Sequence, residues 1–246
     1  DISLKVYIGN VKKLYNNNTL NSVTFLRKTK TILDKIKDFK LPTRRNYLTS
    51  ILVILTEQPT YNKTKEIYKE ELKKLNEIYN THINSHQKTE KEETNWATLK
   101  DLRKVFNYYK RTIKERGFND KSSLTRKDFE FYQLFVICAL YVLLPPIRLD
   151  YAPLSIIKSR NDMDDKSNYL LIISRNVKYF LIRDHKTSDK VGEIEIKVPP
   201  QLNTILNNWL KFNTSSHLLL NKGDKPMTAN ILGKYIGKAF APTGKN

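Results

Sequence analysis

An unbroken apolar run from Leu134 to Leu144 ends at a double proline, and this junction constrains the fold more than any other stretch. A helix that is apolar on all sides is typical of the centre of a domain. It cannot continue through Pro145 and Pro146, because each proline lacks a backbone N–H and its ring clashes with the preceding turn. We therefore expect a buried helix, followed by a stiff corner at the prolines.

One arginine, Arg148, follows the corner at once. Its neighbours Ile147, Leu149 and Leu154 are expected to be buried. Arginine is seldom found among buried apolar residues unless it is paired with an acidic residue or binds an anion. Two interpretations follow, a buried ion pair between Arg148 and Asp150 or an anion-binding site, and the corner alone does not decide between them.

The charge of the chain indicates the kind of partner. Its 246 residues include 44 Lys and Arg against 25 Asp and Glu, a net charge of +19 and a pI near 9.8. The basic excess is present on both sides of Trp96. A polyanion lying across the whole molecule explains this distribution, and duplex DNA is the first candidate. A lysine-rich composition produced by a biased genome is the alternative explanation.

Composition also limits the compartment and the chemistry. The hydrophobic content of 39% suffices for a core, and the longest apolar run is far shorter than the roughly 20 residues of a membrane span. The single cysteine, Cys138, lies in the apolar run, which excludes disulfides and favours a core thiol in a reducing intracellular compartment, such as a host nucleus or cytoplasm. We expect no metal and no cofactor. The chain begins at Asp1 without a methionine or a signal-peptide pattern, so we expect a fragment.

The first part of the chain, residues 1–84, has the 3.6-residue periodicity of helices and no strand pattern. Helices are expected over 2–15, 23–39 and 63–83, with another that Thr43 caps. Arg44 and Arg45 fall in the first turn of that helix, where the backbone favours anions, so they are candidate phosphate ligands. A solvated first turn is the alternative. Residues 85–96 are polar and aperiodic, which is typical of a linker.

The remainder, residues 97–246, begins with an amphipathic helix expected over about 98–116. Its apolar face consists of Leu99, Leu102, Val105, Phe106, Tyr109 and Ile113. Its other face is basic, and we expect it to contact DNA through Lys100, Arg103, Lys104 and Lys110.

After the corner the period changes from 3.6 to 2, over 169–173, 177–183 and 193–198. Strands joined by such short connections must be antiparallel. The loop between the last two carries Lys186 and Lys190, and two helices follow, one after Pro199-Pro200 and one that Thr228 caps. The expected fold class is therefore mainly α with a small three-stranded antiparallel sheet, in a helical domain followed by an α+β domain.

This order of elements (buried helix, arginine corner, small sheet with a lysine in its second loop, two helices) resembles the tyrosine recombinase, or phage integrase, family over most of the chain. The resemblance implies a core-binding domain at 1–84 and the first part of a catalytic domain at 97–246. Such enzymes cut and rejoin duplex DNA through a 3′-phosphotyrosyl intermediate without metal or cofactor, and act as homo-tetramers on DNA. The Pro-Pro-Ile-Arg-Leu-Asp-Tyr corner is most similar to enzymes of large eukaryotic DNA viruses and their mobile elements.

Within this resemblance Arg148 matches the first catalytic arginine. Its planar fork suits two non-bridging oxygens of a phosphate. Lys186, which Thr187 follows, matches the hairpin lysine that acts as general acid toward the leaving 5′-oxygen, with Lys190 as the competitor. The family has an acidic residue three positions after the arginine, where this chain has Tyr151, so Asp150 is the expected orienting partner.

The rest of the family's active site is not in the sequence. The second arginine box, a later His or Trp, and the nucleophilic tyrosine belong downstream of the last helix, and Tyr235 is expected to be buried. We therefore expect a C-terminally truncated chain that is inactive by itself. The alternative is a catalytically inactive DNA-binding or architectural module of the same fold. A helical RNA-binding protein is a further alternative that only the charge supports.

Overall fold

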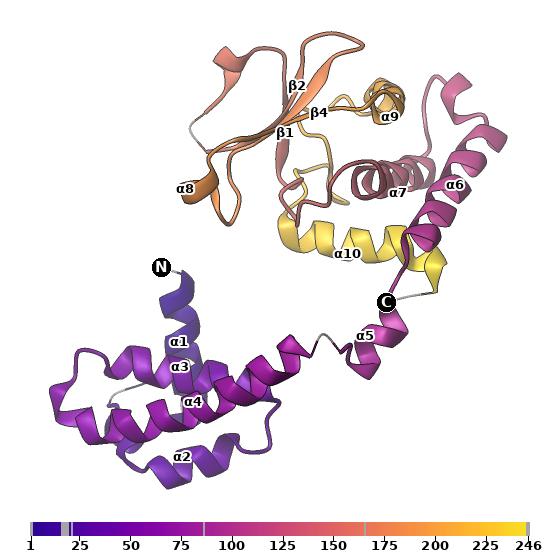
Figure 1. The fold of residues 1–246 in the computed structure, drawn as a ribbon. Helices are drawn as coiled ribbons and strands as arrows, with labels where there is room; N and C mark the ends of the chain where they lie inside the picture. The colour runs from indigo at the N-terminus through magenta and orange to yellow at the C-terminus, as the bar shows by residue number, and fades with distance from the viewer. Residues whose placement is uncertain (1, 16–19, 21, 86, 165, 245–246) are drawn as a thin grey trace. The chain divides into compact units, whose positions relative to one another are not determined.

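The computed structural model describes all residues except 1, 16–19, 21, 86, 165 and 245–246 (Figure 1). The chain forms two compact units, Asp1–Thr89 and Glu90–Asn246, which are described separately. The boundary between them falls inside the predicted linker, whose second half forms a short helix, α5 (Glu90–Asn95). Among the described residues, no helix combines the length and the apolar character needed to cross a membrane.

The described part of the first unit contains helices and no strand. Its elements are α1 (Ile2–Tyr15), the 3₁₀ turn η1 (Thr24–Arg27), α2 (Thr29–Ile36), α3 (Leu41–Leu55), the 3₁₀ turn η2 (Pro59–Tyr61) and α4 (Asn62–Asn84). The helices predicted over 2–15 and 63–83 are confirmed. The helix predicted over 23–39 is interrupted at Lys28, whose ψ of 63° is not helical. The cap predicted at Thr43 is wrong, because α3 already begins at Leu41 and Pro42 occupies its first turn, where a missing N–H costs little.

The core of the first unit lies between α1, α3 and α4, with contributions from η1 and α2. Val11, Leu48 and Ile51 have no exposed surface there. Tyr68 of α4 is also fully buried, and its hydroxyl donates a 2.7 Å hydrogen bond to the carbonyl oxygen of Leu26. The phenol thus satisfies a backbone group of η1 inside the core, which fixes the irregular segment against α4.

The second unit contains two layers, helices and a small sheet. The elements before the sheet are α5, α6 (Leu99–Glu115), the 3₁₀ turn η3 (Phe118–Asp120) and α7 (Arg126–Leu143). The strands and the short elements between them are β1 (Leu154–Ile157), η4 (Arg160–Asp162), β2 (Asn168–Ile172), β3 (Lys178–Ile182), α8 (Ser188–Val191) and β4 (Ile194–Lys197). Three elements follow, α9 (Pro200–Phe212), α10 (Ala229–Phe240) and η5 (Ala241–Thr243).

The sheet has four strands in the order β1-β2-β3-β4, so the prediction of a three-stranded antiparallel sheet is wrong. The three predicted strands exist, as β2, β3 and β4, and pair antiparallel. The additional strand β1 pairs parallel to β2, with Leu154 opposite Asn168. Only four residues long, β1 is too short to show a period, and the connection at 158–167, which contains η4, returns the chain in the parallel direction.

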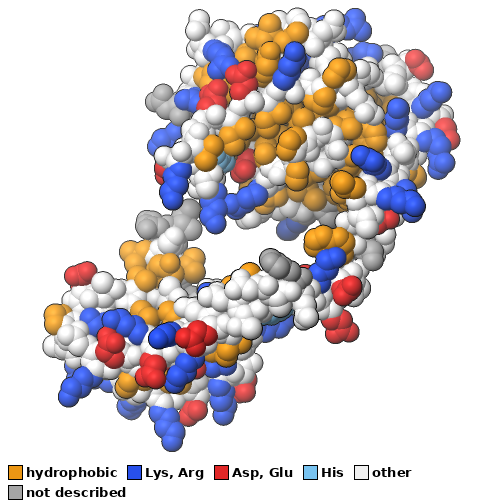
Figure 2. Space-filling view, in the orientation of Figure 1, with side chains coloured by type: hydrophobic (Ala, Val, Ile, Leu, Met, Phe, Trp, Pro, Cys, Tyr) orange, Lys and Arg blue, Asp and Glu red, His pale blue; other side chains and the backbone are white. Residues whose placement is uncertain are grey.

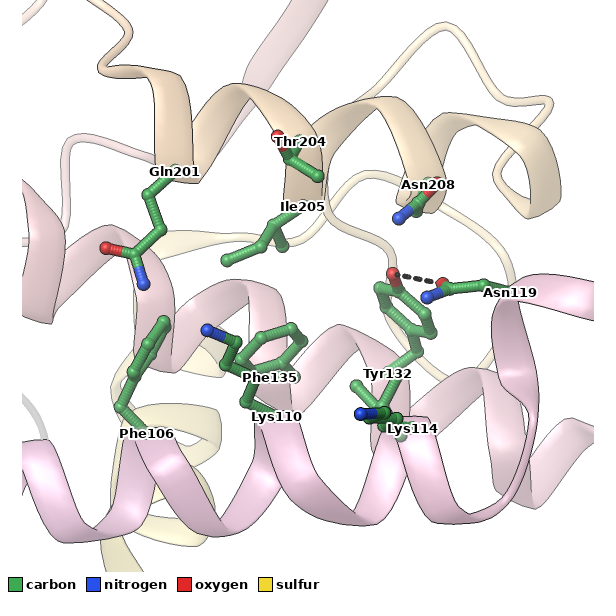
Figure 3. A pocket seen from close by; sticks show the side chains of 11 residues that line it. Phe106, Lys110, Lys114, Asn119, Tyr132, Phe135, Gln201, Thr204, Ile205 and Asn208 are labelled. Carbon is green, nitrogen blue, oxygen red and sulfur yellow. Dashed lines mark hydrogen bonds between the residues drawn. The ribbon is translucent and has the colours of Figure 1, made fainter.

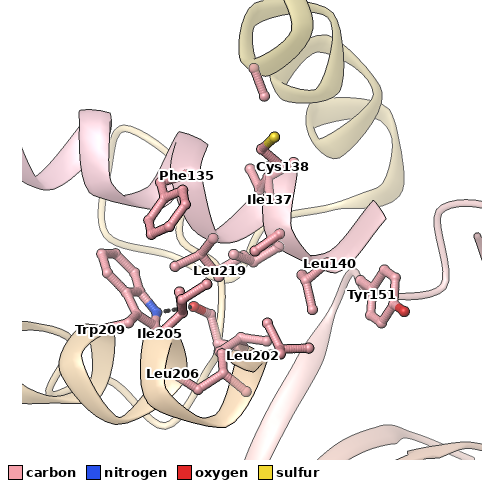
Figure 4. Packing of buried hydrophobic residues seen from close by; sticks show 14 of the residues in the cluster. Phe135, Ile137, Cys138, Leu140, Tyr151, Leu202, Ile205, Leu206, Trp209 and Leu219 are labelled. Atoms are coloured by element: carbon pink, nitrogen blue, oxygen red, sulfur yellow. Dashed lines mark hydrogen bonds between the residues drawn. The ribbon is translucent and has the colours of Figure 1, made fainter. Parts of the chain in front are cut away.

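The main core surrounds α7, whose residues Phe135–Leu140 are at most 3% exposed (Figure 4). Alternate residues of the sheet, Leu170 of β2 with Phe180 and Ile182 of β3, join this core. Residues of the opposite parity form a smaller cluster on the other face of the sheet. This cluster consists of Ile157, Tyr169, Leu171 and Leu181. The alternation follows from the period of two along a strand.

Three single-residue predictions have clear outcomes in the second unit. Cys138 is a fully buried thiol, and burial raises its pKa to about 12, as expected of a core cysteine. Tyr235 of α10 is buried, as predicted, with 6% of its surface exposed. The prediction that Leu99 belongs to the inner face of α6 is wrong, because Leu99 is 68% exposed. It lies in the first turn of α6, before the part of the helix whose side chains enter the core, which begins at Val105.

Candidate nucleic-acid interface

The corner after α7 is held by neutral groups. The hydroxyl of Tyr141 donates a hydrogen bond to the carbonyl oxygen of Arg148, and the N–H of Ala152 donates to the carbonyl of Leu149 at 3.0 Å. The ring of Tyr151 is fully buried and packs edge-on against the rings of Tyr141 and Phe180. Pro145 and Pro146 are exposed at the outside of the corner. The backbone around Arg148 is therefore fixed without the help of its own side chain.

The side chain of Arg148 is exposed, and it forms no hydrogen bond or ion pair with any described residue. The buried ion pair with Asp150 is thus absent from the described structure, and so is the orienting contact predicted for Asp150. Of the predicted apolar neighbours Leu154 is buried, whereas Ile147 and Leu149 are only partly buried. A corner half open to solvent keeps a guanidinium hydrated, so Arg148 needs no partner inside the fold.

The loop between β3 and β4 carries both candidate lysines. Lys186 lies in the turn after β3, and Lys190 lies in α8. A ring nitrogen of His185 is 2.8 Å from the carbonyl oxygen of Gly192, which closes the loop at its base. Both lysines are exposed, and neither has an ion pair with another residue that the structure describes. The nearby Arg183, by contrast, is paired with Glu193 at 3.4 Å.

Asn168, the first residue of β2, joins the corner to the lysine loop. It is 5% exposed. Its Nδ2 donates to the carbonyl oxygens of Asp150 and Asp184, each at 3.0 Å. Its Oδ1 accepts from the backbone N–H of Arg183 at 2.8 Å and of Asp184 at 2.7 Å. All four bonds of one buried amide are therefore made to the backbone of these two segments.

This amide brings Arg148 and Lys186 to the same end of the sheet. The carbonyl oxygens of Asp150 and Asp184 both contact one nitrogen, so they lie within twice the length of those bonds from one another. Arg148 precedes Asp150 by two residues, and Lys186 follows Asp184 by two. Sequence reasoning missed Asn168. A polar residue at the head of an otherwise apolar strand was the available signal, but its partners lie 15 to 18 positions away in the chain.

The predicted basic face of α6 is present and solvated. Lys100, Arg103, Lys104 and Lys110 are all exposed. Lys104 lies 3.8 Å from Asp101, a distance at which an exposed pair contributes little to stability. Basic side chains are spread over the visible surface of both units and are not gathered in one patch (Figure 2). This distribution suits a sequence-independent contact with phosphates.

Arg44 and Arg45, which were predicted as phosphate ligands, both contact α4. Arg44 forms a 3.1 Å ion pair with Glu71 of α4. Arg45 donates a 2.7 Å hydrogen bond to the side-chain oxygen of Asn76, and its guanidinium lies 3.8 Å from the ring centre of Tyr79. Both side chains are half-buried and join α3 to α4. The prediction relied on a helix start at Thr43, whereas the helix starts two residues earlier and turns these arginines toward its neighbour.

Comparison of the chain with models of protein families, with curated proteins and with solved structures found no match.

Proposed function

We propose that this chain is the DNA-binding part, and one half of the active site, of an enzyme that cuts and rejoins duplex DNA in the manner of the tyrosine recombinases. In this proposal Arg148 holds two oxygens of the scissile phosphate, and Lys186 gives a proton to the leaving 5′-oxygen. The exposed lysines and arginines of α6 bind the flanking phosphates. The nucleophilic tyrosine comes from residues outside this chain.

The observation that carries the proposal is the set of bonds made by Asn168. A phosphate can be held by an arginine and protonated by a lysine only if both side chains reach it from a fixed backbone. The amide fixes the two backbones to each other and leaves both charged side chains exposed and unpaired among the described residues. Arg183, near the same loop, is by contrast paired with Glu193.

The first test is duplex binding as a function of salt. Each phosphate contact that is lost should reduce the slope of log affinity against log salt by about 1. We expect Arg148→Ala and Lys186→Ala each to reduce the slope in this way while leaving the thermal unfolding midpoint unchanged. Arg160→Ala is the matched control, because Arg160 is also an exposed arginine of the second unit but is already paired with Glu193 and Glu195. Equal slopes for wild type, Arg148→Ala and Lys186→Ala would refute the phosphate site.

The second test concerns the chemistry. In a full-length protein that carries the family's nucleophilic tyrosine, Arg148→Ala should abolish the covalent DNA–protein product. Asn168→Asp keeps the size and the accepting oxygen but removes the two donated bonds, so it should lower the yield of that product while Arg148 and Lys186 are intact. Normal product formation by Arg148→Ala would show that Arg148 takes no part in the chemistry, and the proposed role of this residue would be wrong.

A further inference from the structure

A cavity of about 370 Å³ lies between α6, α7 and α9 of the second unit (Figure 3). Its floor is apolar and mostly aromatic. Phe106 and Ile113 come from α6, Tyr132 and Phe135 from α7, and Ile205 from α9. The rings of Phe106 and Phe135 are 5.5 Å apart between centroids. A volume of this size, with buried aromatic walls, is typical of small-ligand sites.

The rim of the cavity is polar and differs between its two sides. Lys110 and Lys114, one turn apart on α6, form the cationic side. Neither has an ion pair with a described residue. Gln201, Thr204 and Asn208 of α9 lie on the opposite side, and Asn119 closes one end. The hydroxyl of Tyr132 lies 3.5 Å from the side-chain oxygen of Asn119, at the boundary between floor and rim.

These walls set conditions on a ligand. A hydrocarbon would cover the aromatic floor but would leave the amides of the rim without hydrogen bonds. Inorganic phosphate would match Lys110 and Lys114 but would make no use of the apolar floor. A planar ring with donors and acceptors on its edge, joined to an acidic group, satisfies all three sets of residues. Purine and pyrimidine bases have such rings, which stack on aromatic side chains and bond to Asn and Gln through their edges.

We propose that this cavity binds a nucleotide, with the base against the floor and the phosphate on Lys110 and Lys114. The proposal does not depend on the recombinase chemistry, because it uses none of the residues of the arginine corner or the lysine loop; Lys110 is shared with the basic face of α6. The same chemistry is offered by a free mononucleotide and by an unpaired nucleotide of a nucleic-acid strand. Stacking on Phe106 and Phe135 tolerates every base, so no single base is required.

The experiment is a calorimetric titration of the intact chain with separate ligands. Adenosine 5′-monophosphate and thymidine 5′-monophosphate supply both parts, adenosine supplies the base alone, and inorganic phosphate supplies the charge alone. A short single-stranded oligonucleotide tests the second source. We expect the mononucleotides or the oligonucleotide to bind at least tenfold more tightly than adenosine or phosphate. Binding by mononucleotides identifies a free nucleotide as a sufficient ligand, and binding by the oligonucleotide alone identifies a strand.

Three variants assign that binding to the cavity. Thr204→Trp places a large side chain over the opening from an exposed position, so it should reduce the affinity at least tenfold without changing the fold. The double variant Lys110→Gln, Lys114→Gln should do the same through lost charge. The control is Lys100→Gln combined with Arg103→Gln, on the same helix but outside the cavity lining. It should weaken duplex binding and keep nucleotide binding.

Two results would overturn the proposal. One is that inorganic phosphate binds as tightly as the nucleotides, or that neither the nucleotides nor the oligonucleotide bind at millimolar concentration. The other is that the control variant loses nucleotide affinity to the same extent as the Lys110 and Lys114 variant, because the attraction would then be a property of the whole basic helix. Neither result bears on Arg148 or Lys186, so the two proposals fail separately.

Discussion

Two buried tyrosines of the second unit should respond with opposite signs to the same substitution. The hydroxyl of Tyr151 is buried and has no hydrogen-bond partner among the described residues, although its ring is fully packed. The hydroxyl of Tyr109 is also buried, but it donates a 3.1 Å bond to the carbonyl oxygen of Ala239 in α10. Replacement by phenylalanine removes one oxygen in each case and leaves the rest of the ring in place.

The magnitudes follow from what each oxygen does. A buried polar group without a partner costs about 1–3 kcal/mol, and a made hydrogen bond contributes about 1 kcal/mol net. Tyr151→Phe should therefore raise the free energy of unfolding by about 1 kcal/mol, near the lower limit because removal of the oxygen also leaves a small void. Tyr109→Phe should lower the free energy of unfolding by about 1 kcal/mol or more, since it also leaves the Ala239 carbonyl without this donor.

Urea unfolding followed by tryptophan fluorescence isolates the second unit, because both tryptophans of the chain, Trp96 and Trp209, lie after residue 89. Trp209 is fully buried and supplies the signal change. The slope against urea should be the same for both variants, so that the midpoints report stability alone. If Tyr151→Phe lowers the midpoint as much as Tyr109→Phe does, the Tyr151 hydroxyl has a bond, and the account of the corner is wrong.

The dependence of stability on alkaline pH is a second test of Tyr151 and Tyr109. Burial raises the pKa of Tyr151, with smaller effects of Tyr141 and Asp150, and burial raises the pKa of Tyr109 above its ordinary value too. The unfolded chain loses these protons first, near pH 10. The stabilisation that these two protonated hydroxyls contribute is therefore complete below that pH and is lost as the pH rises above it. Each phenylalanine variant removes one such group, so its stability should fall less steeply above pH 10 than that of the wild type.

Four further substitutions, at three positions, test polar groups of the two units. Gln133→Leu should lower the free energy of unfolding by about 2–4 kcal/mol, measured by urea, because the amide of Gln133 bonds both backbone groups of Leu220 at 2.9 and 2.8 Å. Lys178→Ala should lower the free energy of unfolding by about 2–5 kcal/mol, because Lys178 is 1% exposed and its ammonium group donates to three oxygen acceptors. Lys178→Met should lower it by less, because methionine keeps most of the apolar part of the side chain. Arg45→Ala should lower the thermal midpoint of the first unit, followed by circular dichroism, and leave duplex affinity unchanged. A loss of affinity without a loss of stability would restore Arg45 as a phosphate ligand.

The elements that sequence reasoning predicted are those with a long period. The helices α1, α4, α6, α7 and α9 each repeat their apolar residues over three or more turns, and the strands β2, β3 and β4 alternate between turn residues. The strand β1 was missed because four residues cannot show a period and because its partner is decided by the sheet. The interruption at Lys28 was missed because apolar residues on both sides of it continue one helical stripe.

The candidate site was predictable only in its charged members. Arg148 follows a double proline and Lys186 follows the end of a predicted strand, and both signals can be recognised in the sequence. No comparable sequence signal indicates Asn168. This residue acts through bonds to Asp150 and to the backbone at residues 183 and 184, and these contacts require β2 to lie between β1 and β3 in the sheet. The lining of the nucleotide cavity likewise comes from three helices whose mutual spacing no local pattern encodes.

In the arginine corner and the lysine loop, one set of residues holds the structure and another carries the charges that are proposed to bind phosphate. The proposed function can therefore be removed without loss of the fold. The groups that hold the corner and the loop, the hydroxyl of Tyr141 and the buried amide of Asn168, are uncharged and bond to backbone. The side chains of Arg148 and Lys186 are exposed and bond to no described residue, so burial imposes no desolvation cost on their charges. Removing either charge should therefore leave stability unchanged, whereas removing the Asn168 amide should reduce both stability and phosphate binding. A site in which the charges themselves held the structure would lose stability in all three variants.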